Sequence, residues 1–111
     1  MRTGEALGEF EQVVLLAVLR LGEKAAYAVA IRDEIETRTR RSVSRGSVYI
    51  TLDRLETKGL LRSRLADPTP ERGGRAKRFY VATPRAVAAL RDSRHALLAL
   101  WRGLDGVLGR A

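Results

Sequence analysis

The order of elements over residues 44–83 constrains the fold more than any other feature of the sequence. A helical pattern over Ser44–Gly59 precedes two strand-like runs, Leu60–Ala66 and Ala76–Thr83, which the basic turn Arg72–Arg78 joins. The Gly-Gly pair inside this turn permits a sharp chain reversal, so the two runs are predicted to form a β-hairpin. A helix that fits a DNA groove, followed by a basic hairpin that reaches the DNA backbone, is the layout of a winged helix-turn-helix.

Three further helices are predicted, two of them from apolar residues that recur at intervals of three and four. They cover Leu7–Leu21, Ala26–Thr39 and a final segment that Thr83 caps and Pro84 opens. The expected fold class is therefore mainly α with a small β-hairpin. Residues 1–83 are predicted to form a winged helix-turn-helix DNA-binding domain, and residues 84–111 a C-terminal dimerisation helix.

The first and last helices carry more apolar surface than one small core covers. The last helix has a heptad-like spacing with one polar intrusion at Arg94, and Gly103, Gly106 and Gly109 predict fraying after about residue 103. We therefore expect a homodimer in which the last helix packs against the partner's first and last helices. The predicted interface residues are Leu15, Leu16, Leu19, Val87, Leu90, Leu97, Trp101 and Leu104, and the seam is expected to continue to Leu108.

Positive charge is concentrated around the predicted reading helix and hairpin. The 111-residue chain has a formal net charge of +8, which favours a polyanionic partner. Residues 1–43 hold seven basic and seven acidic residues, residues 44–82 hold nine and four, and residues 83–111 hold five and two. We therefore predict binding to double-stranded DNA. The expected contacts are Tyr27, Ser44, Arg45, Ser47, Tyr49, Ile50, Thr51, Arg54, Lys58, Arg72, Gly73, Gly74, Arg75 and Lys77.

Some of these residues have a purely structural interpretation as well. Ser44 is expected first of all as the N-cap of its helix, although capping and phosphate contact are compatible. Tyr27 either donates to a phosphate or packs, and Ile50 either contacts a thymine methyl group or is simply exposed. Trp101 is expected in the core or the dimer seam. In a dimer its two copies could also flank a pocket for a small hydrophobic effector.

Other functional classes find little support in the sequence. The chain has no cysteine, which excludes disulfides and thiolate metal sites, and His95 is its single histidine. No glycine-rich phosphate loop follows a strand, so neither a cofactor nor an enzymatic activity is expected. No apolar run approaches the roughly 20 residues that span a bilayer, so no membrane partner is expected, and the expected setting is cytoplasmic.

Several segments taken together resemble the PadR family of bacterial transcriptional regulators. The resemblance rests on Leu7–Glu11, the Tyr27 helix with Ile31 and Ile35, Ser44–Tyr49, Leu52–Leu60, Glu71–Tyr80 and Thr83-Pro84. It implies winged-helix dimers that usually repress transcription, and the short C-terminal part is similar to the compact type with a single C-terminal helix. The chain departs from the family pattern at Tyr27-Ala28-Val29, where Tyr-Gly-Tyr is frequent, and at Val48-Tyr49-Ile50, where Val-Tyr-Pro is frequent.

The favoured function is a sequence-specific transcriptional regulator, a repressor that binds a palindromic operator as a homodimer, with release by a small-molecule ligand as a further expectation. The alternative is a winged-helix module that binds protein or RNA without operator recognition. The heptad-like spacing of the last helix favours the transcriptional regulator, because a two-fold dimer matches the two half-sites of a palindrome.

Overall fold

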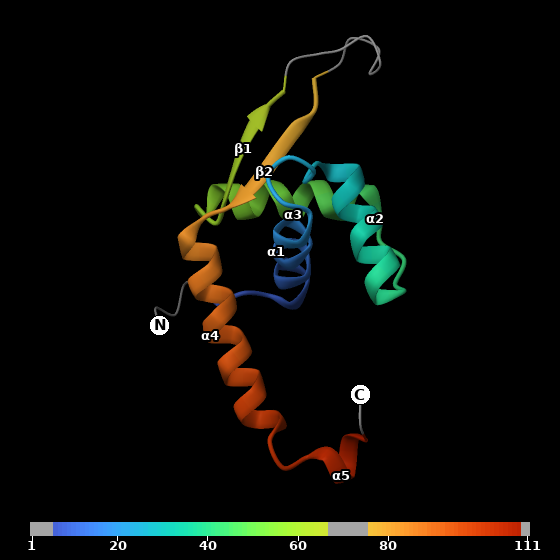
Figure 1. Ribbon diagram of the computed structural model, residues 1–111, viewed down its shortest axis with the longest axis vertical. Coiled ribbons are helices and arrows are strands. Elements are labelled where there is room, and N and C mark those ends of the chain that lie inside the picture. The colour runs from blue at the N-terminus through green and yellow to red at the C-terminus, as the bar shows by residue number, and fades with distance from the viewer. Residues whose placement is uncertain (1–5, 67–75, 110–111) are drawn as a thin grey trace.

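The computed structural model describes residues 6–66 and 76–109 and shows a helical body from which two elements project in opposite directions (Figure 1). The hairpin points one way and the last long helix the other, so the molecule measures 55 × 31 × 21 Å along its principal axes. This architecture confirms the predicted mainly helical class with one hairpin. In chain order the elements are α1 (Glu9–Leu21), α2 (Ala28–Thr39), α3 (Arg45–Thr57), β1 (Leu61–Leu65), β2 (Arg78–Ala82), α4 (Pro84–Trp101) and α5 (Asp105–Leu108).

Local chemistry fixes both ends of α3. Ser44 is its N-cap, as predicted, and its hydroxyl oxygen accepts a hydrogen bond from the Ser47 N–H at 3.1 Å. At the other end Gly59 adopts a φ of +78°, which favours glycine. This left-handed turn lets the Leu60 N–H donate to the Leu55 carbonyl at 2.9 Å. The chain therefore leaves α3 and enters β1 with a single intervening turn.

The hairpin is joined to the body by the segment that precedes α2. Its two five-residue strands pair antiparallel along their full length. The Tyr80 N–H then donates to the Ala26 carbonyl at 2.8 Å, and an isolated antiparallel bridge pairs Tyr27 with Phe79. The base of the hairpin is thus fixed against the start of α2.

One hydrophobic core lies between α1, α2, α3 and the base of the hairpin. It includes Leu15, which is fully buried, so the prediction that Leu15 lies at a dimer interface is wrong. The reason is that α1 occupies the centre of the body and contacts α2, α3 and β2. Leu16 and Leu19 remain exposed, as predicted. The largest fully buried side chains are Leu15, Ile31, Ile35, Leu52, Leu55, Leu60, Leu61, Val14, Val18 and Val48.

The first half of α4 belongs to the same packing unit. The Thr83 hydroxyl oxygen accepts from the Ala86 N–H at 3.3 Å, and Pro84 occupies the first turn, as the sequence predicts. Ala86 and Ala89 are buried against the body. The predicted N-terminal boundary of this helix is therefore confirmed.

The second half of α4 projects away from the body. Every residue of α4 from Arg94 onward is exposed. The helix ends at Trp101, and Gly103 has a φ of +85°, consistent with the predicted fraying near residue 103. Leu104 and Leu108 lie beyond this break, so the predicted continuation of the heptad seam through them is wrong. The physical reason is the glycine-rich sequence, which costs about 1 kcal/mol per glycine in a helix interior.

Candidate nucleic-acid interface

The outer face of α3 presents side chains that the fold of a single chain does not use. Ile50 is 60% exposed, and Tyr49 and Arg54 are exposed beside it. Within residues 6–66 and 76–109 the guanidinium groups of Arg45 and Arg54 form neither an ion pair nor a hydrogen bond. These residues are therefore accessible from solvent, and their contact with DNA stays a prediction.

Thr51 departs from the predicted pattern. It was predicted as a DNA contact, but it is only 5% exposed, so it does not belong to the exposed face of α3. Three residues before it lies Val48 and four residues after it lies Leu55, both of them buried. On a helix such neighbours share one side, which makes Thr51 part of the core-facing side.

Lys58 is tied to the fold. Its ammonium group lies 2.7 Å from a carboxylate oxygen of Glu11, which is 7% exposed and also accepts from the Gly8 N–H at 2.9 Å. Burial alone raises the pKa of the Glu11 carboxyl. The hydrogen bonds from Lys58 and Gly8 and the charges of Lys58 and Arg54 outweigh this effect, so the net pKa is lowered. This ion pair joins the end of α3 to the start of α1.

Aromatic rings and cations are interleaved at the base of the hairpin. The rings of Tyr27 and Phe79 meet edge to face, with centroids 5.5 Å apart. The Lys77 ammonium lies 3.8 Å from the Tyr27 centroid, and the Arg64 guanidinium lies 5.1 Å from the Phe79 centroid. These are cation–π distances, and they hold two positive charges beside the start of α2. Tyr27 therefore packs and also positions a cation.

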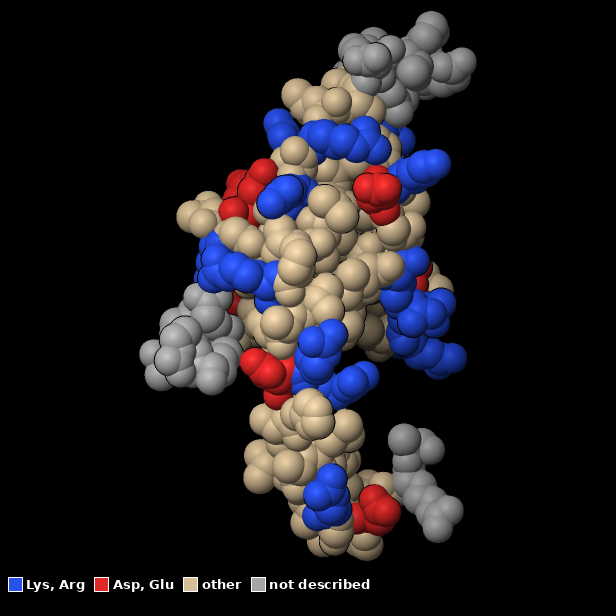
Figure 2. Space-filling view, turned by 60° about the vertical axis from the view of Figure 1, so that its left-hand side comes forward, with Lys and Arg blue, Asp and Glu red and all other residues tan. Residues whose placement is uncertain are grey.

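A polar relay connects the hairpin to α3. Arg78 donates to the Ser63 hydroxyl at 2.9 Å, and that hydroxyl donates to a Glu56 carboxylate oxygen at 2.7 Å. The sequence did not single out Ser63, Glu56, Arg64 or Phe79, because their roles arise from the register of the two strands. Figure 2 shows Lys and Arg side chains over the body and the hairpin base, with fewer acidic groups among them.

The predicted contacts in the hairpin turn, Arg72, Gly73, Gly74 and Arg75, lie outside the described residues. The Ser47 hydroxyl donates a hydrogen bond to the Ser44 carbonyl at 2.9 Å, so it already has a partner at the start of α3. The structure brings Tyr27, Tyr49 and Lys77 to one small hollow between the body and the hairpin.

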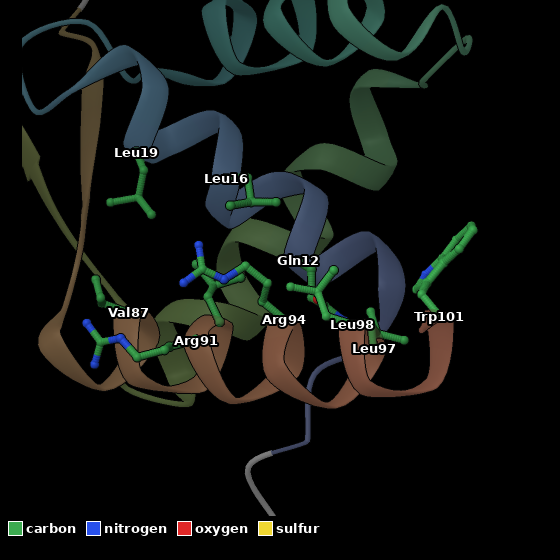
Figure 3. A pocket seen from close by; sticks show the side chains of 10 residues that line it. Gln12, Leu16, Leu19, Val87, Arg91, Arg94, Leu97, Leu98 and Trp101 are labelled. Carbon is green, nitrogen blue, oxygen red and sulfur yellow. The ribbon is translucent and has the colours of Figure 1, made fainter. Parts of the chain in front are cut away.

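A second exposed feature is an apolar groove of about 490 Å³ between α1 and α4. In Figure 3 the two helices border it, with Val87 near one end and Trp101 at the other. The Ser93 hydroxyl donates to the Gln12 side-chain oxygen at 2.8 Å and joins the two helices. The groove is lined by Gln12, Leu16, Leu19, Val87, Leu90, Arg91, Arg94, Leu97, Leu98 and Trp101.

The described ranges contain neither a membrane-spanning helix nor a metal-binding cluster. None of the helices there is both long enough and apolar enough to cross a membrane. Among the same residues, no three His, Asp or Glu side chains gather in a way that could hold a metal ion.

Sequence comparisons place the chain near known regulators. The family model described as "Transcriptional regulator PadR-like family" matches residues 15–92. The transcriptional regulator Rv3488 of Mycobacterium tuberculosis is 48% identical over 66 residues, which are 58% of this chain and 56% of that relative. The match therefore spans little more than half the length of the relative.

Solved structures share the fold. A PadR-like transcription factor from Bacteroides fragilis superposes with a TM-score of 0.69 at 22% identity, over 88% of each chain. A PadR family regulator from Eggerthella lenta gives a TM-score of 0.68 at 22% identity, over 93% of this chain and 88% of the other. The complex structure of hsRosR-SG gives a TM-score of 0.64 at 28% identity, over 87% and 78% of the two chains.

Proposed function

Because the chain belongs to the PadR-like family of transcriptional regulators, we propose that it is a sequence-specific DNA-binding repressor that occupies a palindromic operator as a homodimer. The exposed outer face of α3 carries the proposal. The major groove of DNA admits an α-helix, an arginine such as Arg54 pairs with guanine through two hydrogen bonds, and an apolar side chain such as Ile50 contacts a thymine methyl group. None of these side-chain positions is needed for the core.

The hairpin supplies the sequence-independent part of binding. Lys77 and Arg64 are held at its base by aromatic rings, and the sequence adds Arg72 and Arg75 in the turn. Cations of this kind neutralise backbone phosphates and fix the register of the protein on the duplex. In this arrangement α3 reads bases while the hairpin anchors the complex.

The groove between α1 and α4 supports the dimer. Leu97 and Trp101 of one copy would cover Leu16 and Leu19 of the other, which removes apolar surface from water on both sides. A two-fold dimer presents its two α3 helices to two half-sites. The groove volume of about 490 Å³ lies within the roughly 300–1,000 Å³ of ligand pockets. A small hydrophobic effector that entered the seam would alter the spacing of the α3 helices and release the operator.

The decisive experiment selects bound sequences from random duplexes and then measures affinity for the selected duplex, a scrambled duplex and an RNA of the same length. We expect the selected duplex to bind at least about 1,000-fold more tightly than the scrambled one, with a palindromic consensus. Equal affinity for the three nucleic acids, or no affinity for any of them, would favour the protein-binding or RNA-binding alternative.

A further inference from the structure

All three tyrosines of the chain line one small hollow. It has a volume of about 170 Å³ and lies between the start of α2, the outer side of α3 and strand β2. Among the described residues, no acidic side chain lines it. We name it the tyrosine hollow; its lining residues are Tyr27, Ala28, Val29, Tyr49, Lys77, Arg78 and Tyr80.

The start of α2, where Ala28 and Val29 line the hollow, carries hydrogen-bond donors. The N-cap residue Tyr27 provides no side-chain cap. Within the described part of the chain, no acceptor meets the backbone N–H groups of Ala28, Val29 and Ala30. Such groups carry the positive end of the helix dipole. Lys77 adds a full charge here, because its ammonium is held over the Tyr27 ring.

Tyr80 is the second and independent observation. It is only 4% exposed, yet its hydroxyl forms no hydrogen bond with any residue in the ranges that the structure describes. Buried polar groups are nearly always paired, so an unpaired hydroxyl in a hollow requires an explanation. Burial, followed by the charge of Glu56, raises the pKa of Tyr80. The phenol therefore keeps its proton and remains a donor.

We propose that the tyrosine hollow binds one phosphodiester group of the DNA backbone, with the Tyr80 hydroxyl and the first N–H groups of α2 as donors and Lys77 as the counter-charge. The proposal rests on the proposed function and adds a specific anchor to it. Tyr49 lies on α3 and lines the same hollow, so the bound phosphate fixes the depth and angle at which α3 meets the DNA.

The first test removes one oxygen atom. Tyr80→Phe should leave thermal stability unchanged or slightly raised, because the hydroxyl has no partner within the described residues. Affinity for cognate and scrambled duplexes should fall by the same factor, about tenfold, since hydrogen bonds to charged groups are stronger than neutral ones. The slope of affinity against salt should not change. Thr37→Val, which removes an exposed hydroxyl from the same helix α2, is the matched control and should change neither quantity.

The second variant tests the charge. Lys77→Ala should weaken both duplexes alike and reduce the salt slope by about one unit for each subunit. A lower melting temperature of Tyr80→Phe would mean that the hydroxyl has a structural role and would overturn the proposal. An unchanged DNA affinity of Tyr80→Phe would overturn it as well, while leaving DNA recognition by α3 intact. If the wild-type protein bound no DNA, the proposed function would fail together with the hollow.

The phosphate itself is identified with duplexes that carry one neutral methylphosphonate per half-site. At one position the neutral linkage should weaken the wild-type protein, and Tyr80→Phe should lose no further affinity there, because the two changes remove the same contact. A scan without such a position would overturn the assignment. Inorganic phosphate offers similar oxygen acceptors. If phosphate buffer abolished the Tyr80 effect while the scan showed no coupling, the hollow would be a site for free phosphate and not for DNA.

Discussion

The outer face of α3 and the outer half of α4 are both exposed, but they differ in the chemistry of their exposed side chains. On α3 the exposed residues include Arg45 and Arg54, which lack acidic partners within the described residues, with Tyr49 and Ile50 beside them. On α4 the apolar residues Leu97 and Trp101 follow one another along the helix, and Figure 2 shows this projecting part as mainly uncharged. Unpaired cations favour a polyanionic partner, whereas exposed leucines and a tryptophan favour contact with another apolar surface.

The two halves of α4 show why this difference is informative. In the first half Ala86 and Ala89 are buried against the body, and the N-cap Thr83 is satisfied. The second half has the same helical geometry, but residues 6–66 and 76–109 leave it exposed. Because most helical stability in proteins comes from the packing of an apolar face, the proposed second subunit would stabilise this half as a helix.

The largest effect should follow from charging the α4 seam. Replacing Leu97 and Trp101 by Asp should raise the dimer dissociation constant by at least about 10⁵-fold, since the dimer loses four buried apolar side chains that each contribute roughly 1.5–3 kcal/mol and the new carboxylates would be buried. Light scattering over a concentration series measures the change.

Leu100→Asp is the control for that experiment. Leu100 is 74% exposed on the same helix but does not line the groove between α1 and α4. We expect this variant to remain dimeric. If Leu100→Asp dissociated the dimer while the Leu97 and Trp101 replacements left it intact, a different face of α4 would form the interface.

The next largest effect is that of salt on DNA affinity. Each subunit offers about four to five cations, so a dimer should neutralise about eight phosphates, with a slope of about −7 in log affinity against log salt. Affinity should therefore fall by about 10³–10⁵ between 50 and 200 mM salt. Fluorescence anisotropy at four salt concentrations measures the slope. A slope near zero would mean that the cationic character of the α3 face and the hairpin has no part in binding.

Features that depend on neighbouring residues could be predicted from the sequence, and those that depend on distant pairs could not. The caps Ser44 and Thr83 and the break near Gly103 follow from local chemistry. The Glu11–Lys58 ion pair joins residues 47 positions apart, and no local pattern indicates it.

The errors within helices have a common cause. Leu15 was predicted at a dimer interface and Thr51 as a DNA contact, but both are buried. Helical periodicity gives the angles between side chains but not the direction from which the other elements cover a helix. The tyrosine hollow escaped prediction for the same reason, because strand register and the isolated bridge to Phe79 bring its walls together.

The third prediction concerns the cationic residues of α3 and the hairpin. It separates the residues that read bases from those that anchor the protein to the DNA backbone. Arg54→Ala should lower the ratio of specific to nonspecific affinity by about 1–3 kcal/mol if its guanidinium pairs with a guanine. Arg75→Ala, chosen from the sequence alone, should weaken cognate and scrambled duplexes by similar factors. Affinities for both duplexes at two salt concentrations provide the measurement. If only Arg75→Ala changed sequence preference, the roles of α3 and the hairpin would have to be exchanged.

The smallest effect concerns Lys58, one turn beyond Arg54 on the same helix. Its partner Glu11 has a lowered pKa in the folded protein, so ionised Glu11 stabilises the fold above the ordinary value of 4.5. This stabilisation is lost as pH falls below 4.5 through the lowered pKa. Glu11→Gln should therefore unfold more easily than the wild type at pH 7, by only about 1 kcal/mol because the Lys58 side chain is 36% exposed.

Denaturant unfolding at a fixed protein concentration, repeated from pH 7 down to pH 3, measures this difference between Glu11→Gln and the wild type. The two free energies of unfolding should converge below pH 4.5, because protonation of Glu11 removes the same charge that the substitution removes. A constant difference over the whole range would mean that packing, and not charge, accounts for the loss. DNA affinity at pH 7 should change far less than in Arg54→Ala. If it rose by as much as Arg54→Ala lowers it, the released Lys58 would act like the unpaired cations of the α3 face, and the contrast between these two residues would be lost.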